Sequence, residues 1–309
     1  IRAFGTGLLN LDLMGERIVV VGKNRYEWCI SYLATTCSNM VIVPIDKALP
    51  DIEMQRLIER SEAKAIIFDE KYLETIKKVQ EKENSNLKTL ICMDNIQEKG
   101  IKTFNEILEE GRNQIKNGDQ KYDNIEIDEN KMAIMLFTSG TTNEPKAVML
   151  SQANICANIS NIACWVKLYP TDVLLSFLPI HHTFECTITF LYGFYSGSQV
   201  AFCDGLKHIQ QNLKEYKVSV FVAVPLVLET MYKKIQKAIE EQGKTGLIKK
   251  MTKISNTLLK AKIDIRKIVF KQILDNFGGH LRVVLYGAAP MNKATIIGYN
   301  NLGISLIQG

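Results

Sequence analysis

Hydroxyl side chains and one lysine gather between residues 136 and 150, where the sequence reads LFTSGTTNEPKAVML. The apolar run that opens this stretch predicts a strand ending at Phe137. The polar groups that follow are Thr138, Ser139, Thr141 and Thr142 around Gly140, and then Lys146. Hydroxyls, the free N–H groups of a tight turn and an ammonium are donors that suit a polyphosphate. The stretch therefore predicts a phosphate-binding loop.

This loop differs from a Walker-type phosphate loop. Gly140 and Lys146 have the separation of that motif. The motif also needs Gly before the lysine and Ser or Thr after it to hold magnesium, and those places hold Pro145 and Ala147. The first third of the chain has no Gly-x-Gly-x-x-Gly, which argues against a Rossmann dinucleotide site.

The stretch resembles the phosphate loop of the AMP-forming adenylating enzymes, the superfamily of acyl-CoA synthetases, peptide-synthetase adenylation domains and luciferases. The family pattern Thr-Ser-Gly-Thr-Thr-Gly-x-Pro-Lys-Gly matches at residues 138–142, Pro145 and Lys146. Asn143 and Ala147 stand where the family has Gly, but neither change removes a donor, and Asn tolerates positive φ. The ordered match disfavours the alternative of a Ser/Thr-rich surface turn.

A second motif, LPIHHTFEC, covers residues 178–186. It resembles Leu-Pro-x-x-His-x-Phe-Glu of the long-chain fatty acid branch, with His182, Phe184 and Glu185 at the family's histidine, aromatic and acid. The resemblance implies that His182 lies beside the substrate carboxylate, where an imidazole orients the attacking oxygen or offsets its charge. Two alternatives are a metal site made by His182, Glu185 and Cys186, and a purely structural histidine at a helix start.

A third motif begins at residue 281. Gly287, Ala288 and Ala289 precede Pro290 and resemble the family's adenine-side loop, where small residues after a strand let a purine lie on the backbone. Residues 303–309 resemble the strand that leads into the family's Tyr-Gly-x-Thr-Glu. The resemblance implies that the magnesium ligand, the ribose-binding aspartate and the mobile carboxy-terminal domain with its lysine lie beyond residue 309. We also expect an upstream segment, because the chain opens on what looks like the tail of an amphipathic helix.

Short β-branched runs alternate with helical patterns, which predicts an α/β fold of two subdomains with mostly parallel sheets and crossover helices. The first subdomain is expected at residues 1–125 and the second at 126–309, with a polar junction near 118–130. Predicted strands are 17–21, 41–44, 65–68, 89–92, 132–137, 148–150, 173–177, 199–202, 218–224, 282–286 and 304–307. Predicted helices in the first subdomain are 24–37, 51–61, 71–80 and 103–114.

Composition excludes disorder, since 46% of residues are hydrophobic and 23% are charged. A net charge of +5 is too small to indicate a nucleic-acid-binding protein. Residues 244–271 nevertheless hold nine basic residues and one acid, with apolar residues at helical spacing. This window predicts one or two basic amphipathic helices. They form either a solvated face or a peripheral contact with anionic lipid.

The seven cysteines are scattered through apolar runs, which predicts buried thiols in a reducing cytosol. No apolar run reaches the 18 residues that a transmembrane helix needs. A cytoplasmic protein, membrane-associated if the basic window binds lipid, is therefore expected.

Taken together, the motifs imply ATP-dependent activation of a carboxylic acid, with a long-chain fatty acid as the preferred expectation. The acid would be converted to an acyl-adenylate and then to an acyl-CoA, with release of pyrophosphate and AMP. Lys146 and His182 are the expected catalytic residues, and ATP, Mg²⁺ and coenzyme A the expected cofactors. Because the chain ends before the third motif is complete, we expect it to be inactive alone. An adenylation domain or acyl-carrier-protein ligase, and a nucleotide-binding scaffold, remain alternatives. The sequence defines no oligomeric state.

Overall fold

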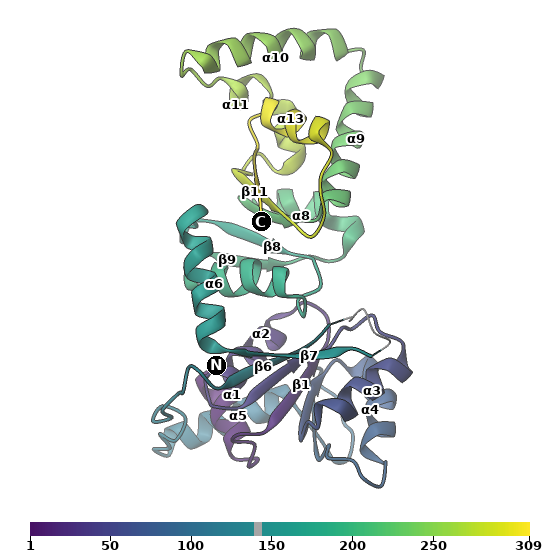
Figure 1. Ribbon diagram of the computed structural model, residues 1–309, viewed down its shortest axis with the longest axis vertical. Coiled ribbons are helices and arrows are strands. Elements are labelled where there is room, and N and C mark those ends of the chain that lie inside the picture. Colours follow the sequence, from purple (N-terminus) through teal and green to yellow (C-terminus); the bar gives the residue numbers. More distant parts are fainter. Residues whose placement is uncertain (139–143) are drawn as a thin grey trace. The chain divides into compact units, whose positions relative to one another are not determined.

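The computed structural model describes residues 1–138 and 144–309. The chain forms two compact units, residues 1–161 and 162–309, and each has its own sheet. Figure 1 shows the first unit from purple to teal and the second from teal to yellow. The α/β class with mostly parallel sheets is confirmed in both units.

The first unit is built on a seven-stranded sheet in the order β5-β4-β3-β1-β2-β6-β7. Its strands are β1 (Arg17–Val21), β2 (Val41–Pro44), β3 (Ala65–Phe68), β4 (Thr89–Cys92), β5 (Ile101–Thr103), β6 (Met132–Thr138) and β7 (Lys146–Ser151). All neighbouring pairs are parallel except β6 and β7. The first four strands have the predicted bounds, because β-branched and other apolar residues fill them.

Helices cover both faces of this sheet. They are α1 (Arg2–Leu9), α2 (Tyr26–Thr36), α3 (Asp51–Ser61), η1 (Glu70–Tyr72), α4 (Leu73–Gln80) and α5 (Phe104–Lys116), with α6 (Gln152–Trp165) following β7. Apolar residues of α3 and α4 pack with alternate residues of β1 to β4 in one core. Helices α1 and α5 lie side by side (Figure 1), and the rings of Phe4 and Phe104 stack with centroids 4.3 Å apart. Thr103 begins α5 through a capping box with Glu106.

The boundary between the units differs from the predicted one near residue 125. Strand β6 pairs with β2 through Ile134 and Ile42, and β7 folds back on β6, so both strands extend the first sheet. The polar segment 118–130 is therefore a connection within the first unit. Local composition could not reveal this, because a junction and an ordinary surface loop share the same polar residues.

The second unit has a five-stranded sheet in the order β12-β11-β10-β8-β9. Its strands are β8 (Val173–Ser176), β9 (Gln199–Phe202), β10 (Val220–Ala223), β11 (Val283–Tyr286) and β12 (Ser305–Gln308), all parallel to their neighbours. Its helices are η2 (Glu185–Tyr192), α7 (Gly193–Tyr195), η3 (Leu206–His208), α8 (Ile209–Glu215), α9 (Pro225–Glu241), α10 (Thr245–Lys260), α11 (Arg266–Val269), α12 (Lys271–Leu274), η4 (Asp275–Phe277) and α13 (Lys293–Asn301).

The core of the second unit lies between its sheet and helices α8, α9 and α13, with Phe221, Leu228 and Tyr299 fully or almost fully buried. The predicted basic amphipathic helices are confirmed as helical, because α10 and α11 lie within the window 244–271. Helix α10 exposes Leu247 and Ile254, while Ile248 and Met251 pack inward.

The prediction of buried cysteines was wrong for Cys156 and Cys164. Both are exposed thiols on α6, a helix none of whose residues is buried. Their apolar neighbours therefore do not mark a core. Among the described residues, no helix is both long enough and apolar enough to cross a bilayer.

Candidate functional site

The two described ends of the predicted phosphate loop lie opposite one another. Thr138 is the last residue of β6 and Lys146 the first of β7, and the antiparallel register pairs them directly. Both residues are exposed. Ser139, Gly140, Thr141 and Thr142 lie outside the described residues, and their roles stay predictions. The register thus places the Lys146 backbone beside the point where the polar sequence begins.

His182 is exposed and precedes η2 by three residues. Its Nδ1 accepts a hydrogen bond of 3.2 Å from the backbone N–H of Phe184. An accepting Nδ1 carries no proton, so the neutral ring has its N–H at Nε2. That N–H can donate to a carboxylate oxygen, which is compatible with the predicted role of His182.

The alternative of a metal site at this motif would use His182, Glu185 and Cys186, all of which are described residues. Within the described parts of the chain, no group of three His, Cys, Asp or Glu side chains is arranged to hold a metal ion. Cys186 is buried within η2.

The structure brings the second and third motifs together. A Cβ atom on Gly287 would lie 2.9 Å from Cε2 of Phe184, and a Cβ on Gly309 would lie 3.3 Å from the same atom. The ring of Phe184 therefore packs on backbone at the ends of β11 and β12, and glycine at 287 permits this approach.

Ala288, next to Gly287, is exposed and has a φ of +70°. A residue with a Cβ in this left-handed region costs about 1–2 kcal/mol. Sequence reasoning assigned Ala288 to the adenine side through its small size but did not anticipate this strain. Strained backbone of this kind gathers at functional sites, where the surrounding structure maintains it.

Glu185 was matched to the family's acid without a role, and the structure gives it unusual surroundings. Its side chain is fully buried at the start of η2, an eight-residue π-helix. Burial raises the pKa of Glu185 to about 8, against the opposing effect of hydrogen bonds from Ser176, Thr189 and the backbone of Phe177. The only sequence signal was a single acid within the apolar run FECTITFLY.

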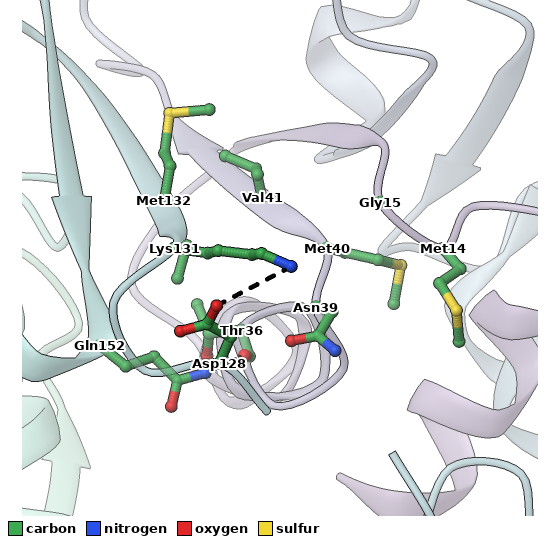
Figure 2. A pocket seen from close by; sticks show the side chains of 11 residues that line it. Met14, Gly15, Thr36, Asn39, Met40, Val41, Asp128, Lys131, Met132 and Gln152 are labelled. Atoms are coloured by element: carbon green, nitrogen blue, oxygen red, sulfur yellow. Dashed lines mark hydrogen bonds and ion pairs between the residues drawn. The ribbon is translucent and has the colours of Figure 1, made fainter. Parts of the chain in front are cut away.

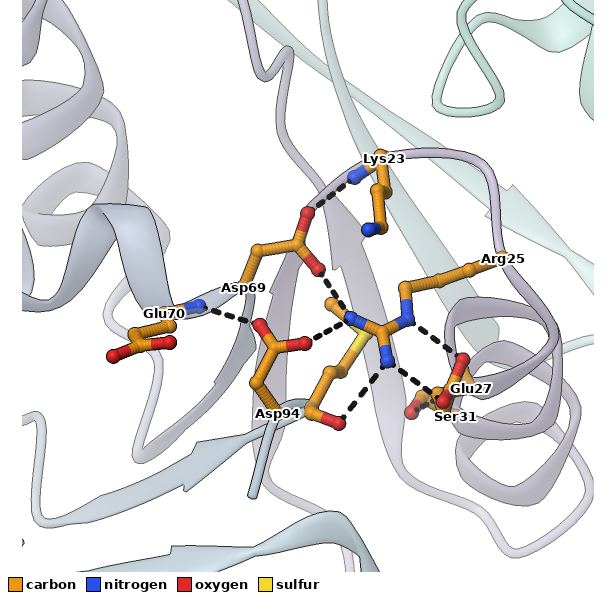
Figure 3. A network of polar contacts seen from close by, with 8 residues as sticks. Lys23, Arg25, Glu27, Ser31, Asp69, Glu70 and Asp94 are labelled. Atoms are coloured by element: carbon orange, nitrogen blue, oxygen red, sulfur yellow. Dashed lines mark hydrogen bonds and ion pairs between the residues drawn. The ribbon is translucent and has the colours of Figure 1, made fainter. Parts of the chain in front are cut away.

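The corresponding edge of the first sheet holds a network of charges centred on Arg25 (Figure 3). Arg25 forms two 2.7 Å bonds to Glu27, one of 2.6 Å to Asp94 and one of 3.2 Å to Asp69. Asp69 also accepts from the Lys23 backbone. These residues lie within two positions of the ends of β1, β3 and β4 or at the start of α2.

The Arg25 network perturbs its own carboxyl groups. Burial is the largest single influence on the pKa of Glu27 and acts to raise it, but the hydrogen bonds and charge of Arg25, with further hydrogen bonds, together lower the pKa below its ordinary value. For Asp94, burial is likewise outweighed by the combined effect of the Arg25 hydrogen bond and charge, the backbone N–H of Glu70 and the charge of Lys23, so its pKa is also lowered. Hydrogen bonding to Glu27 is the largest cause that raises the pKa of Arg25. The carboxylates of Glu27 and Asp94 are thus held ionised by a nearby cation, as expected of a structural ion cluster.

Two cavities, one in each unit, are lined by none of the described motif residues. In the first unit, a cavity of about 380 Å³ is lined by residues that include Val41 and Met132, with Lys131 3.8 Å from Asp128 (Figure 2). Val41 and Met132 begin β2 and β6, so this cavity lies at the end of β6 opposite to Thr138.

In the second unit, a cavity of about 520 Å³ lies between α8 and α9. Its lining is mainly apolar, with Lys207 and Lys234, and includes neither His182 nor residues 287–289. The volume of a cavity therefore does not locate the candidate site in this chain. Open sites formed by loops at strand ends enclose little space.

The chain is similar in sequence to fatty acid ligases. It is 29% identical to long-chain-fatty-acid–CoA ligase 6 of Mus musculus, over 99% of this chain and 46% of the relative. It is 30% identical to long-chain-fatty-acid–CoA ligase 5 of Rattus norvegicus, over 90% of this chain and 43% of the relative. Long chain acyl-CoA synthetase 4 of Arabidopsis thaliana is 28% identical over 94% of this chain and 46% of the relative. The chain spans about half the length of these relatives.

Solved structures share the fold. A long-chain-fatty-acid–CoA ligase from Archaeoglobus fulgidus superposes with a TM-score of 0.73 at 19% identity, covering 100% of this chain and 55% of that chain. The N-terminal domain of FACL13 from Mycobacterium tuberculosis superposes with a TM-score of 0.70 at 19% identity, covering 99% of this chain and 66% of that chain.

The family model described as AMP-binding enzyme matches residues 1–309. Since the match covers the whole sequence and agrees with the phosphate-loop, histidine and adenine-side motifs, the chain belongs to the AMP-binding enzyme family.

Proposed function

We propose that this chain supplies the ATP-binding and acid-binding part of an enzyme that activates a long-chain fatty acid. In the first step a carboxylate oxygen attacks the α-phosphorus of ATP, the bond to pyrophosphate breaks, and acyl-adenylate forms. In the second step the thiol of coenzyme A attacks the acyl carbon and AMP leaves. The match over residues 1–309 and the similarity to fatty acid ligases support this proposal.

The main requirement of the first step is charge neutralisation, because an anion attacks a polyanion. The phosphate loop, residues 138–142 with Lys146, binds the β- and γ-phosphates. The observation that carries the proposal is the register of β6 and β7, which sets Lys146 opposite Thr138 at the two ends of this loop. Both residues are exposed and so accessible to a nucleotide.

His182 and the adenine-side loop act on the other parts of the substrates. The N–H at Nε2 of His182 donates a hydrogen bond to one oxygen of the substrate carboxylate. This directs the other carboxylate oxygen toward the α-phosphorus of ATP. Residues 287–289 form the wall on which the base lies. The contact between Phe184 and Gly287 supports a shared site, because it joins the two motifs within one unit.

Magnesium, when bound, screens the phosphate charge in ATP-dependent adenylation. Among the described residues no cluster of acidic or histidine side chains suits it, so we assign no residue of this chain to magnesium. We also assign no residue of this chain to coenzyme A.

Pyrophosphate exchange into ATP by the complete protein tests the proposal, with fatty, aromatic and amino acids compared at equal concentration. We expect exchange to depend on a fatty acid and to increase with chain length, since each buried methylene contributes about 0.8 kcal/mol. Exchange with amino acids alone would instead favour an adenylation domain. Nucleotide binding without exchange for any acid would favour a scaffold. Acyl transfer to coenzyme A, compared with a carrier protein, identifies the acceptor.

We propose in addition that α10 and α11 form a peripheral contact with anionic lipid. Leu247, Ile254 and Ile268 are exposed by 53%, 48% and 78%, which gives this segment apolar side chains that can enter the surface of a lipid bilayer. Exposed lysines lie between them, and each basic residue near an anionic membrane contributes about 1 kcal/mol. A fatty acid substrate partitions into such membranes.

Cosedimentation with vesicles of increasing anionic lipid content tests this contact. We expect binding that weakens at high salt and in a variant with Lys249, Lys250 and Lys253 changed to Gln. The matched control changes Lys78, Lys82 and Lys88 of the first unit to Gln and should bind normally. Absence of binding, or binding insensitive to salt and to the first set of changes, would leave α10 as a solvated surface helix.

A further inference from the structure

Glu185 is a buried carboxyl group for which the proposed chemistry has no use. Oε2 accepts a 2.9 Å hydrogen bond from Oγ1 of Thr189, while Oε1 has no hydrogen-bond partner within the described chain. No charged group is among the causes that shift its pKa. A buried carboxylate with no cation among the described residues and with an unpaired Oε1 is very unfavourable, which favours the neutral carboxylic acid form of Glu185.

The neutral acid lies between two parts of the chain that border one loop. Ser176 is the last residue of β8, and its hydroxyl and the N–H of Phe177 act on the Glu185 carboxyl from that side. Thr189 acts on it from within η2. The segment between them, residues 177–184, carries His182 and Phe184. The buried side chain of Glu185 thus connects the end of β8 to η2, at the two ends of the loop that carries His182.

The helix itself favours this interpretation. A π-helix is rare and is found mostly as a single turn at functional sites, because its backbone geometry is less favourable than that of an α-helix. In η2 all eight residues are buried. Phe184 immediately precedes η2 and packs against Gly287 and Gly309. A shift in the start of η2 would therefore move both Phe184 and the Nδ1 hydrogen bond of His182.

We propose that Glu185 is a positioning residue that, as a neutral acid bridging β8 and η2, holds His182 and Phe184 in place against the adenine-side loop. This inference rests on the proposed function for its effect on activity, but its effect on the geometry of His182 can be measured without any reaction.

The activity test measures pyrophosphate exchange by the complete protein in three variants and one control variant. Glu185→Gln keeps a neutral side chain of the same shape and should stay within about threefold of wild type. Glu185→Ala removes the bridge and should lower kcat/KM for the carboxylic acid about tenfold to hundredfold, with KM for ATP little changed, because small displacements of a reacting group have effects of this size. Thr189→Val removes one donor to the carboxyl and should lower kcat/KM by a smaller factor.

Leu191→Ala is the matched control, because Leu191 is also buried in η2. It should reduce stability and leave kcat/KM for the acid near wild type. Equal losses of kcat/KM in Leu191→Ala and Glu185→Ala would overturn the proposal. If Glu185→Ala fails to fold, normal activity of Thr189→Val together with strong inactivation by Glu185→Gln would overturn it as well.

The second measurement uses the ring ¹⁵N resonances of His182 in this chain, identified with a His182→Gln variant. We expect wild type and Glu185→Gln to show one tautomer with an unprotonated Nδ1. Thr189→Val and Glu185→Ala should show averaging between tautomers, since the hydrogen bond from Phe184 weakens. An unchanged ring spectrum in Glu185→Ala would contradict the inference, whatever the exchange assay shows. Absence of exchange by wild type with every acid would contradict the proposed function only.

Discussion

At the strand ends of the first sheet, Arg25 contacts three carboxylates, whereas at the strand ends of the second sheet the carboxyl of Glu185 has no charged partner within the described residues. The two edges are equivalent in topology, since both carry the loops that follow parallel strands. At the ends of β1, β3 and β4, the charged groups around Arg25 are satisfied by side chains of the first unit itself. The second edge has an unpaired Oε1, a strained Ala288 and an exposed His182.

This difference separates a structural use of strand ends, at β1, β3 and β4, from a functional use at the second sheet, while the proposed phosphate loop lies at the end of β6 in the first sheet. Paired ions stabilise the connection between strands and leave little capacity to bind a ligand. Unpaired and strained groups reduce stability, and they persist when they are needed to hold a ligand or a reacting group. The following predictions test whether the two edges differ in this way.

The largest expected effect is on stability at the first edge. Arg25→Ala leaves Glu27, Asp69 and Asp94 without their common cation, and removal of one partner from such a buried pair costs about 3–5 kcal/mol. The side chain of Arg25 is only 16% exposed, so solvent screening is weak. Urea denaturation should show this loss in the free energy of unfolding.

The control for Arg25 is Arg112→Ala, because Arg112 is half-exposed and, within the described part of the chain, forms one ion pair, with Glu109. It should change the free energy of unfolding by less than about 0.5 kcal/mol. If the two arginine variants lost equal stability, the first edge would not be a structural network.

The next largest effect is on catalysis and not on stability. Lys146→Ala in the complete protein should reduce transition-state binding by about 2–4 kcal/mol, measured as kcat/KM for ATP, because a charged donor to a developing anion is lost. The free energy of unfolding should stay unchanged, since Lys146 is exposed. Lys250→Ala on α10 should alter neither quantity. A normal kcat/KM for ATP in Lys146→Ala would remove Lys146 from the site.

The two edges should also respond to pH with opposite sign. The folded-state pKa values of Glu27 and Asp94 lie below their unfolded values near 4, so their stabilisation is complete above about pH 5 and is lost as the pH falls through the folded values. Glu185 has a folded pKa of about 8, so between about pH 4.5 and 8 the unfolded state releases a proton that the folded state keeps. Its contribution to stability therefore decreases as the pH rises.

Glu185→Gln isolates this second contribution, because glutamine does not titrate. The free energy of unfolding of the variant, relative to wild type, should increase by more than about 1 kcal/mol between pH 5 and pH 8. Parallel stability curves for the two proteins would show that Glu185 is ionised in the folded state.

The smallest effect is expected at Ala288. Ala288→Gly removes the strain of an alanine at positive φ, which stabilises the folded state. Glycine also makes the unfolded state more flexible, which offsets part of this gain. We expect a net increase of about 0.5–1 kcal/mol in the free energy of unfolding. KM for ATP should rise a few-fold in the complete protein, because the loop is less preorganised. Ala289→Gly is the matched control and should lose stability, since Ala289 is not among the described residues with positive φ.

The local patterns of the sequence were sufficient to predict the elements of the sheets. β1 to β4 and β9 have their predicted bounds, because runs of β-branched and other apolar residues form buried strands whichever partners they find. The order of the motifs was likewise enough to identify the family, since it depends only on residue types and spacing.

Tertiary structure alone decided which sheet each strand joins and which polar groups are paired. β6 and β7 extend the first sheet because β6 finds an open edge at β2, which no pattern within residues 126–151 could reveal. The exposure of Cys156 and Cys164 likewise depends on what covers α6.

The sequence by itself determined the chemistry that is available, namely the hydroxyls and the lysine of the phosphate loop, the histidine, and the small residues of the adenine-side loop. Only the folded chain decided that Glu185 is buried without a cation, that Phe184 packs on Gly287, and that Ala288 is strained. The physical reason is the distance along the sequence over which each effect acts. Backbone preference is set by neighbours a few residues away, whereas burial, ion pairing and strain depend on contacts between segments as distant in the sequence as Phe184 and Gly287.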